Sequence, residues 1–323
     1  MKGLRTNIGL ATVVLLATAA LAGATTTPTA APGTVNYVEG QVALDGQGLA
    51  RKQTGSTLLE TNQVLDTGQG KAEVLLTPGV FFRLGDNSEV RMISPGLADT
   101  RVELVKGSAM LEVDQLYKEN DLSVVVGGST TRIEKEGLYD FHAEPASVSV
   151  IDGKATVYEG DAHVDVKKGH EALLASGQPL KSRSLNKEAV ESDALYRWSK
   201  LRGEYEADAN LNAAYMVNAY GGWYGPGWYW DPFWNFYSFL PGYGFLYSPF
   251  GWGFYSPGWV WGHPYYRYPA IGHAGFRAAA PNAGHYAATA HTAGPRMESA
   301  GGFHGGGFAG GGFHGGGGFG GRR

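Results

Sequence analysis

The sequence predicts an all-β domain, built as a compact multi-stranded β-solenoid or sandwich, followed by one amphipathic α-helix and a disordered low-complexity tail. Between residues 34 and 183, short apolar alternations separated by Gly, Asp and Asn recur about every 8 to 12 residues. Residues 184–218 change to apolar spacings of three and four, which are typical of a helix. Residues 269–323 are dominated by Gly, Ala and His and lack apolar periodicity.

Residues 1–24 have the pattern of a secretory signal peptide. Lys2 and Arg5 precede an apolar run from Ile8 to Leu21, and small residues follow up to Ala24. The run is shorter than the roughly 20 apolar residues that span a bilayer, so we expect cleavage after Ala24, with retention as an anchor as the alternative. The protein is then exported to the periplasm or the outer cell envelope, and residues 25–33 form a Thr/Pro-rich linker. We expect no transmembrane span after signal cleavage.

Composition excludes several classes of protein. The chain contains no cysteine, which excludes disulfides, thiolate nucleophiles and a lipidated cysteine. The net charge is −4, and all but two of the 30 acidic residues lie between residues 25 and 218. Without a basic stripe the chain is not expected to bind nucleic acid.

Turn signals divide residues 34–183 into strands. Asp45-Gly46 and Pro78-Gly79 separate alternating apolar runs, as a β-hairpin requires. The pattern apolar-x-Gly-x-apolar-x-apolar occurs three times, at residues 38–44, 105–111 and 151–157. We expect its glycine to adopt positive φ, so that each copy is a strand, a tight turn and the next strand of a hairpin. The copies are unevenly spaced, which leaves both the solenoid and the sandwich open.

Residues 184–218 are predicted to form one helix that begins at Ser184 as N-cap. Its apolar stripe consists of Leu195, Trp198, Leu201 and Tyr205. We expect this stripe to pack on the β domain or a neighbouring segment, with a membrane-surface helix as the alternative, and the charged residues to point away from it. The charged residues are Arg197, Lys200, Arg202, Glu204 and Glu206.

Residues 219–268 contain seven of the eight tryptophans, interrupted by Gly and Pro. These rings must be buried against the segment itself, the helix, another molecule or a membrane interface. Self-packing and a binding surface are both open. The candidate binding residues are Trp223, Trp228, Trp230, Trp234, Trp252, Trp259 and Trp261.

No catalytic, cofactor-binding or metal-binding residue is assigned, and we predict that the protein is not an enzyme. The carboxylate pairs Glu112/Asp114 and Glu134/Glu136 are alternate strand residues, which usually form a solvated face. His304 and His314 in the tail are separated by Gly, Phe and Ala only, which is not a preformed metal site.

The stretch from Val35 to about Ala175 resembles the FecR-like periplasmic domain of Gram-negative envelope proteins. The resemblance is carried by residues 40–42, 62–68, 72–74, 83–90, 105–107 and 137–141. The family's namesakes are transmembrane signal transducers that bind a sigma factor in the cytoplasm and sense an outer-membrane transporter. Only a few residues precede the apolar run here, so we expect no cytoplasmic sigma-factor-binding module.

The resemblance implies an exported protein-interaction module with a signalling or scaffold role, whose partner is another envelope protein. The alternative function is a structural envelope protein, which attaches to peptidoglycan, polysaccharide or the outer membrane through the aromatic C-terminal region.

Overall fold

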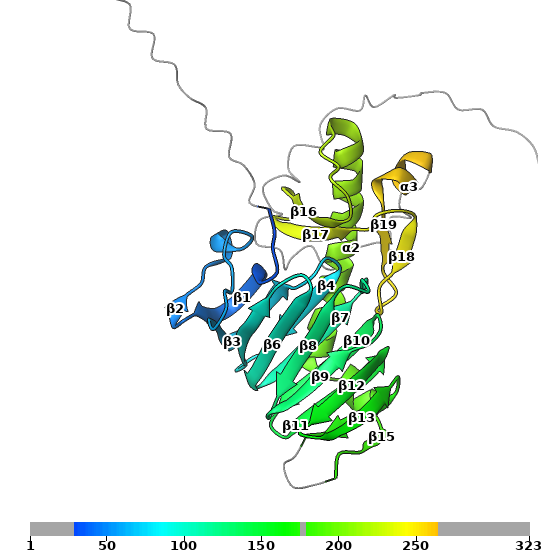
Figure 1. Cartoon of the computed structure of the whole chain (residues 1–323). Helices are drawn as coiled ribbons and strands as arrows, with labels where there is room; N and C mark the ends of the chain where they lie inside the picture. Colours follow the sequence, from blue (N-terminus) through cyan, green and yellow to red (C-terminus); the bar gives the residue numbers. More distant parts are fainter. Residues whose placement is uncertain (1–28, 175–178, 264–323) are drawn as a thin grey trace, which may run out of the picture. The chain divides into compact units, whose positions relative to one another are not determined.

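The structure is a computed structural model that describes residues 29–174 and 179–263 (Figure 1). The predicted signal peptide and the predicted tail lie outside the described residues. Strands are the predominant regular structure of the described chain, which confirms the predicted fold class, and a long helix lies beyond the last strand of the main sheet.

Fifteen strands form one continuous sheet. They are β1 (Thr34–Leu44), β2 (Gln47–Gly48), β3 (Val64–Leu75), β4 (Val80–Leu84), β5 (Glu89–Pro95), β6 (Asp99–Lys106), β7 (Ser108–Val113), β8 (Asp121–Val126), β9 (Ser129–Ile133), β10 (Gly137–Ala143), β11 (Ala146–Asp152), β12 (Lys154–Glu159), β13 (Ala162–Lys167), β14 (His170–Leu173) and β15 (Ser182–Ser184). A 3₁₀ helix, η1 (Arg51–Gln53), follows β2.

The sheet folds over on itself at β3. The first residues of β3, Val64–Asp66, pair with β5, and its last residues, Ala72–Leu75, pair with β4. One layer continues through β5, β6, β8, β9, β12 and β13, and the other through β4, β7, β10, β11, β14 and β15. Val102 and Val124 of the first layer share one core with Leu111 and Phe141 of the second. The domain is therefore a sandwich made from a single sheet.

Two copies of the recurring glycine motif mark corners between these layers. The glycine of the first copy, Gly40, lies within β1 at a register irregularity, so the tight turn predicted there is wrong. β6 and β7 meet at Gly107, yet β6 pairs with β5 and β8 while β7 pairs with β4 and β10. β11 and β12 likewise separate at Gly153. The predicted hairpins at these two positions are wrong, whereas those at Asp45-Gly46 and Pro78-Gly79 are confirmed. After the corner at Gly107 the chain returns to the first layer, where β8 lies parallel to β6.

Residues 184–218 form two helices instead of the one we predicted. Ser184 ends β15, and Asn186 caps the short helix α1 (Lys187–Glu191). Asp193 has an extended backbone, and its carboxylate accepts the N–H groups of Leu195 and Tyr196 at the start of α2 (Ala194–Tyr220). A side chain that caps the second helix in this way competes with continuation of the first.

The face that α2 buries is more polar than predicted. It carries Leu195 from the expected stripe, but also Ser199, Arg202, Glu206 and Asn210. The expectation that Arg202 and Glu206 point away from the core is wrong, because the helix packs on a sheet face that itself carries charged side chains.

Residues 221–263, here called the aromatic unit, form short elements beside α2 (Figure 1). They are the hairpin β16 (Gly227–Asp231) and β17 (Phe236–Leu240), the hairpin β18 (Phe245–Tyr247) and β19 (Gly253–Tyr255), and the helix α3 (Pro257–Gly262). Among the described residues, no helix has the length and apolar character of a membrane span.

The part of the second layer formed by β4, β7 and the end of β3 is buried on both faces. Its outer residues Leu75 and Phe81 form a cluster with Trp228, Phe239 and other residues of the aromatic unit and α2. Alternate polar residues on β3, β4 and β7 are therefore buried as well. The prediction that the pair at positions 112 and 114 lies on a solvated face is wrong for this reason.

Candidate functional site

The seven tryptophans of the candidate surface have different environments. Trp228 is buried, with 4% of its surface exposed, and its ring lies edge-on to Phe81 and Phe239 at centroid distances of 5.1 and 5.9 Å. Trp223 and Trp261 are exposed, at 41% and 73%.

The other four tryptophans are half-buried and contact neighbouring elements. Trp230 lies edge-on to Tyr237, and Trp234 packs on Tyr205 of α2. The indole N–H of Trp252 donates to the carbonyl of Lys200 on α2 at 3.1 Å. Trp259 stacks on Tyr255 and His263. Part of the aromatic content thus holds the unit in place, and part remains available at the surface.

Two asparagine side chains attach the aromatic unit to the rest of the fold. Asn36 of β1 donates to the carbonyl of Tyr237 at 2.9 Å and accepts from its N–H at 2.8 Å. Asn210 of α2 exchanges the same pair of hydrogen bonds with Tyr255. An amide side chain that donates to the carbonyl and accepts from the N–H of one residue makes the hydrogen bonds that a neighbouring strand would make. These bonds fix the position of the hairpins on the sandwich.

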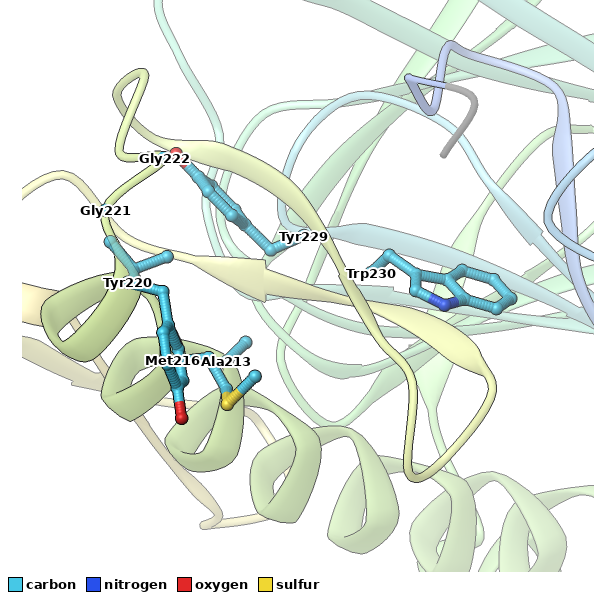
Figure 2. A pocket seen from close by; sticks show the side chains of 8 residues that line it. Ala213, Met216, Tyr220, Gly221, Gly222, Tyr229 and Trp230 are labelled. Carbon is cyan, nitrogen blue, oxygen red and sulfur yellow. The ribbon is translucent and has the colours of Figure 1, made fainter. Parts of the chain in front are cut away.

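A cavity of about 270 Å³ lies between the last turns of α2 and strand β16 (Figure 2). Ala213, Met216 and Tyr220 of α2 form one wall, and Tyr229 of β16 forms another. The chain between these walls passes through Gly221, which has φ of 80° and ends the helix.

Two further rings stack on Tyr229, which lines this cavity. The rings of Trp223 and Tyr224 are nearly parallel to that of Tyr229, at centroid distances of 5.5 and 4.3 Å. The Tyr229 hydroxyl accepts from Tyr224 N–H at 3.0 Å and donates to the Gly225 carbonyl at 2.8 Å. Burial raises the pKa of Tyr224 to about 12, so its hydroxyl keeps its proton and donates to the Trp228 carbonyl. The loop is therefore held in one conformation by its own side chains.

We call Met216, Tyr220, Trp223, Tyr224 and Tyr229 the aromatic face. Tyr220 and Tyr224 are 81% and 63% exposed, and Met216 is 40% exposed. Exposed apolar surface held on a rigid scaffold is typical of a binding site, since such surface costs free energy in water.

A second group of functional candidates lies inside the protein. We call Glu73, Arg83, Glu112, Asp114, Arg202 and Glu206 the buried ion cluster. Arg83 donates to Glu73 at 2.7 Å and to Glu112 at 2.5 Å, and Arg202 donates to Glu73 at 2.7 Å and to Glu206 at 2.5 Å. The cluster therefore joins strands β3, β4 and β7 to helix α2.

Sequence reasoning missed this cluster because each of its members reads as a solvated residue. One signal was present: Arg202 and Glu206 are spaced i, i+4 on the same helix face as Leu195 and Ser199, which the structure buries.

Burial raises the pKa of Glu206, and the neighbouring charge of Glu73 raises it further, against the effect of Arg202. Burial and the charge of Glu112 likewise raise the pKa of Asp114 well above its usual value. Burial opposes ionisation of Glu73 as well, but the guanidinium groups of Arg202 and Arg83 outweigh it and hold the pKa of Glu73 below its usual range.

Comparison with known proteins gives little further information. No protein-family model and no curated protein matches the chain. Two crystal structures of a proposed anti-sigma factor from Parabacteroides distasonis ATCC 8503 are similar to it. One is 14% identical with a TM-score of 0.35 and covers 39% of this chain, which spans 61% of that structure. The other is 12% identical with a TM-score of 0.36, over 55% of this chain and 98% of that structure. These values carry no conclusion about function.

Proposed function

We propose that this protein is an exported, non-enzymatic interaction module with a signalling or scaffold role, and that it binds an envelope protein through the aromatic face. The observation that carries the proposal is that exposed Tyr220 lines the cavity, while exposed Trp223 and Tyr224 stack on Tyr229, which also lines it. Tyr, Trp and Met are the residues enriched at the centres of protein interfaces. The resemblance to the FecR-like periplasmic domain supports an interaction role in the envelope.

The free edges of the sheet support binding less well. β13 ends one side of the strand order, and its outward residues include Asp165 and Lys167. Charged side chains on an edge strand discourage addition of a further strand. The other end, β15, has only three residues, Ser182 to Ser184. The aromatic face is therefore the better candidate for the working surface.

Attachment to a polysaccharide is the second candidate function. The near-parallel stack of Trp223, Tyr224 and Tyr229 favours it, because flat rings offer an apolar platform to other flat apolar surfaces, such as the face of a sugar ring. Export is part of both proposals, and mass spectrometry of the mature protein tests it: a chain that begins at Thr25 supports cleavage after Ala24.

The test is photocrosslinking in the producing cells with a benzophenone amino acid at Tyr220, or at Tyr158 as the control. Tyr158 lies on β12 in the sandwich and is 40% exposed. One discrete protein adduct from position 220, absent from position 158, supports the interaction module.

A matched pair of double variants separates the two candidates. Tyr220→Ser with Trp223→Ser removes exposed rings of the aromatic face, and Leu97→Ser with Tyr158→Ser removes exposed apolar residues elsewhere. Loss of sedimentation with the cell wall in the first variant only, without any protein adduct, supports polysaccharide attachment. The aromatic face is not the binding surface if position 220 gives no adduct that position 158 lacks, and if both double variants sediment equally with the cell wall.

A further inference from the structure

The buried ion cluster contains four carboxyl groups and two guanidinium groups. All six side chains are at most 4% exposed. If every carboxyl group were ionised, the cluster would hold two negative charges without a partner. Burying an unpaired charge is strongly unfavourable, so groups in this position shed their charge.

Buried oxygens without a partner show where the charge is shed. Arg202 donates to Oε1 of Glu206, whereas Glu206 Oε2 is buried and has no hydrogen-bond partner among the described residues. Both carboxyl oxygens of Asp114 are buried in the same way. An ionised carboxyl group would leave an unpaired buried charge at each of these positions, so we assign one proton to Glu206 and one to Asp114. Two protons equal the excess of carboxyl groups over guanidinium groups.

The groups that face the cluster do not supply the missing positive charge. On β1, Asn36 donates to Glu73 and Glu206, and the Tyr37 ring lies 4.2 Å from the Arg202 guanidinium carbon. From the aromatic unit, the Phe236 ring lies 4.4 Å from the same carbon, and Ser248, which lowers the pKa of Glu112, carries no charge. Glu136, ahead of β10, adds a like charge near Asp114.

We propose that the seam between α2 and the sheet is a proton-dependent latch, which is closed while two of its four carboxyl groups hold protons and opens when alkaline solution removes them. The Glu206 end of the cluster belongs to α2, whose last turns carry Met216 and Tyr220 of the aromatic face. Opening of the seam would therefore separate the two walls of the cavity. The latch does not depend on which partner that face binds.

The sign of the effect follows from the protons. Asp114 and Glu206 bind protons in the folded state at pH values where the unfolded chain has lost them, so stability falls as pH rises above their usual range. For each proton that the folded state holds and the unfolded chain has lost, the unfolding equilibrium constant rises by up to about tenfold when the pH rises by one unit. Glu73, whose pKa is lowered, acts oppositely, and its contribution is lost only as pH falls below its usual value.

Urea unfolding of the full mature chain between about pH 5.5 and 8.5 tests the latch. Glu206→Gln and Asp114→Asn replace a protonated carboxyl group by a neutral group of the same shape. We expect each single variant to reduce the steepness of the pH dependence by up to about tenfold per pH unit, and the double variant to flatten it. The raised pKa of His142 also removes stability as pH rises, and the variant His142→Gln measures this separate contribution.

Hydrogen exchange locates the opening. In the wild-type protein, amides of α2 and β17 should lose protection with rising pH beyond the expected change in intrinsic exchange rate, while those of β8 and β9 should not. Infrared spectroscopy needs no variant: a protonated carboxyl band should be present in the folded protein near neutral pH. Absence of that band, an unchanged pH dependence in Glu206→Gln and Asp114→Asn, or loss of stability on chelation of divalent cations would each overturn the proposal.

Discussion

The side-chain amide of Asn210 pairs with the backbone of Tyr255 in both directions. Tyr255 N–H donates to Asn210 Oδ1 at 2.8 Å, and Asn210 Nδ2 donates to the Tyr255 carbonyl at 3.1 Å and to the Phe239 carbonyl at 2.8 Å. One helical side chain thus ties together the strands of two different hairpins.

Asn210→Ala should lower the free energy of unfolding by about 2–3 kcal/mol, because it leaves a buried N–H and two carbonyls without partners. Asn218→Ala is the matched control on the same helix, where one bond to the Pro257 carbonyl is lost, and should cost about 1 kcal/mol or less. Urea denaturation measures both. Equal losses of unfolding free energy in the two variants would contradict an additional contribution from the pairing of Asn210 with Tyr255.

Arg83→Met should destabilise the protein by about 3–5 kcal/mol, since it leaves Glu73 and Glu112 buried without this cation. Arg91→Met breaks the exposed pair with Glu103 and should change stability by about 1 kcal/mol at most. Chemical denaturation at one pH compares the two variants. A small effect of Arg83→Met would show that the cluster rearranges or admits water.

Gly107→Ala should be more destabilising than Gly46→Ala, although both glycines have positive φ, at 77° and 75°. An added Cβ at position 46 meets no atom within 4 Å, so only the backbone cost of about 1–2 kcal/mol applies. At position 107 it would lie 2.6 Å from the Cα of Ser88, which adds about 1–3 kcal/mol of overpacking. Thermal unfolding of the two variants, if indistinguishable, would contradict the close approach at this corner.

A chain that ends at Tyr220 should lose cooperative unfolding and bind a hydrophobic dye, because Leu75 and Phe81 lose their covering residues. A chain that ends at His263 keeps every contact described above and should unfold at the wild-type temperature. Calorimetry and dye fluorescence on both chains check this. Cooperative unfolding of the shorter chain would show that the sandwich is stable alone.

The His142 pKa should lie above its ordinary value of 6.5, because its Nε2 is hydrogen-bonded to Asp140 at 3.0 Å. The stability that this bond contributes is present below the unfolded pKa and is lost as pH rises through the folded pKa. Asp140→Asn should return the pKa toward the ordinary value in an NMR titration. An unchanged titration would assign the shift to other neighbours.

The inner face of the sandwich could be predicted from sequence because its apolar residues alternate, as Ala72 and Val74 do. The outer face could not, since Glu73 and Glu112 also fit a solvated strand face. Only the distant α2 and aromatic unit decide that this face is buried.

The candidate site could be predicted as a region but not as a set of residues. Trp228 and Tyr229 are neighbours in sequence, yet one packs against Phe81 and the other borders the cavity, because successive strand residues face opposite sides. The pairing register of β16 and β17 decides which of the two rings faces the cavity, and this register cannot be predicted from composition.

Asn36 and Tyr237 are hydrogen-bonded across 201 positions of the chain. Because the ribosome makes the chain from its N-terminus, β1 is present long before β17. Until then, Leu75 and Phe81 lack their cover and offer apolar surface to chaperones or to other chains. The aromatic unit is thus the last of the described elements to be made, and a chain interrupted before it leaves Leu75 and Phe81 uncovered.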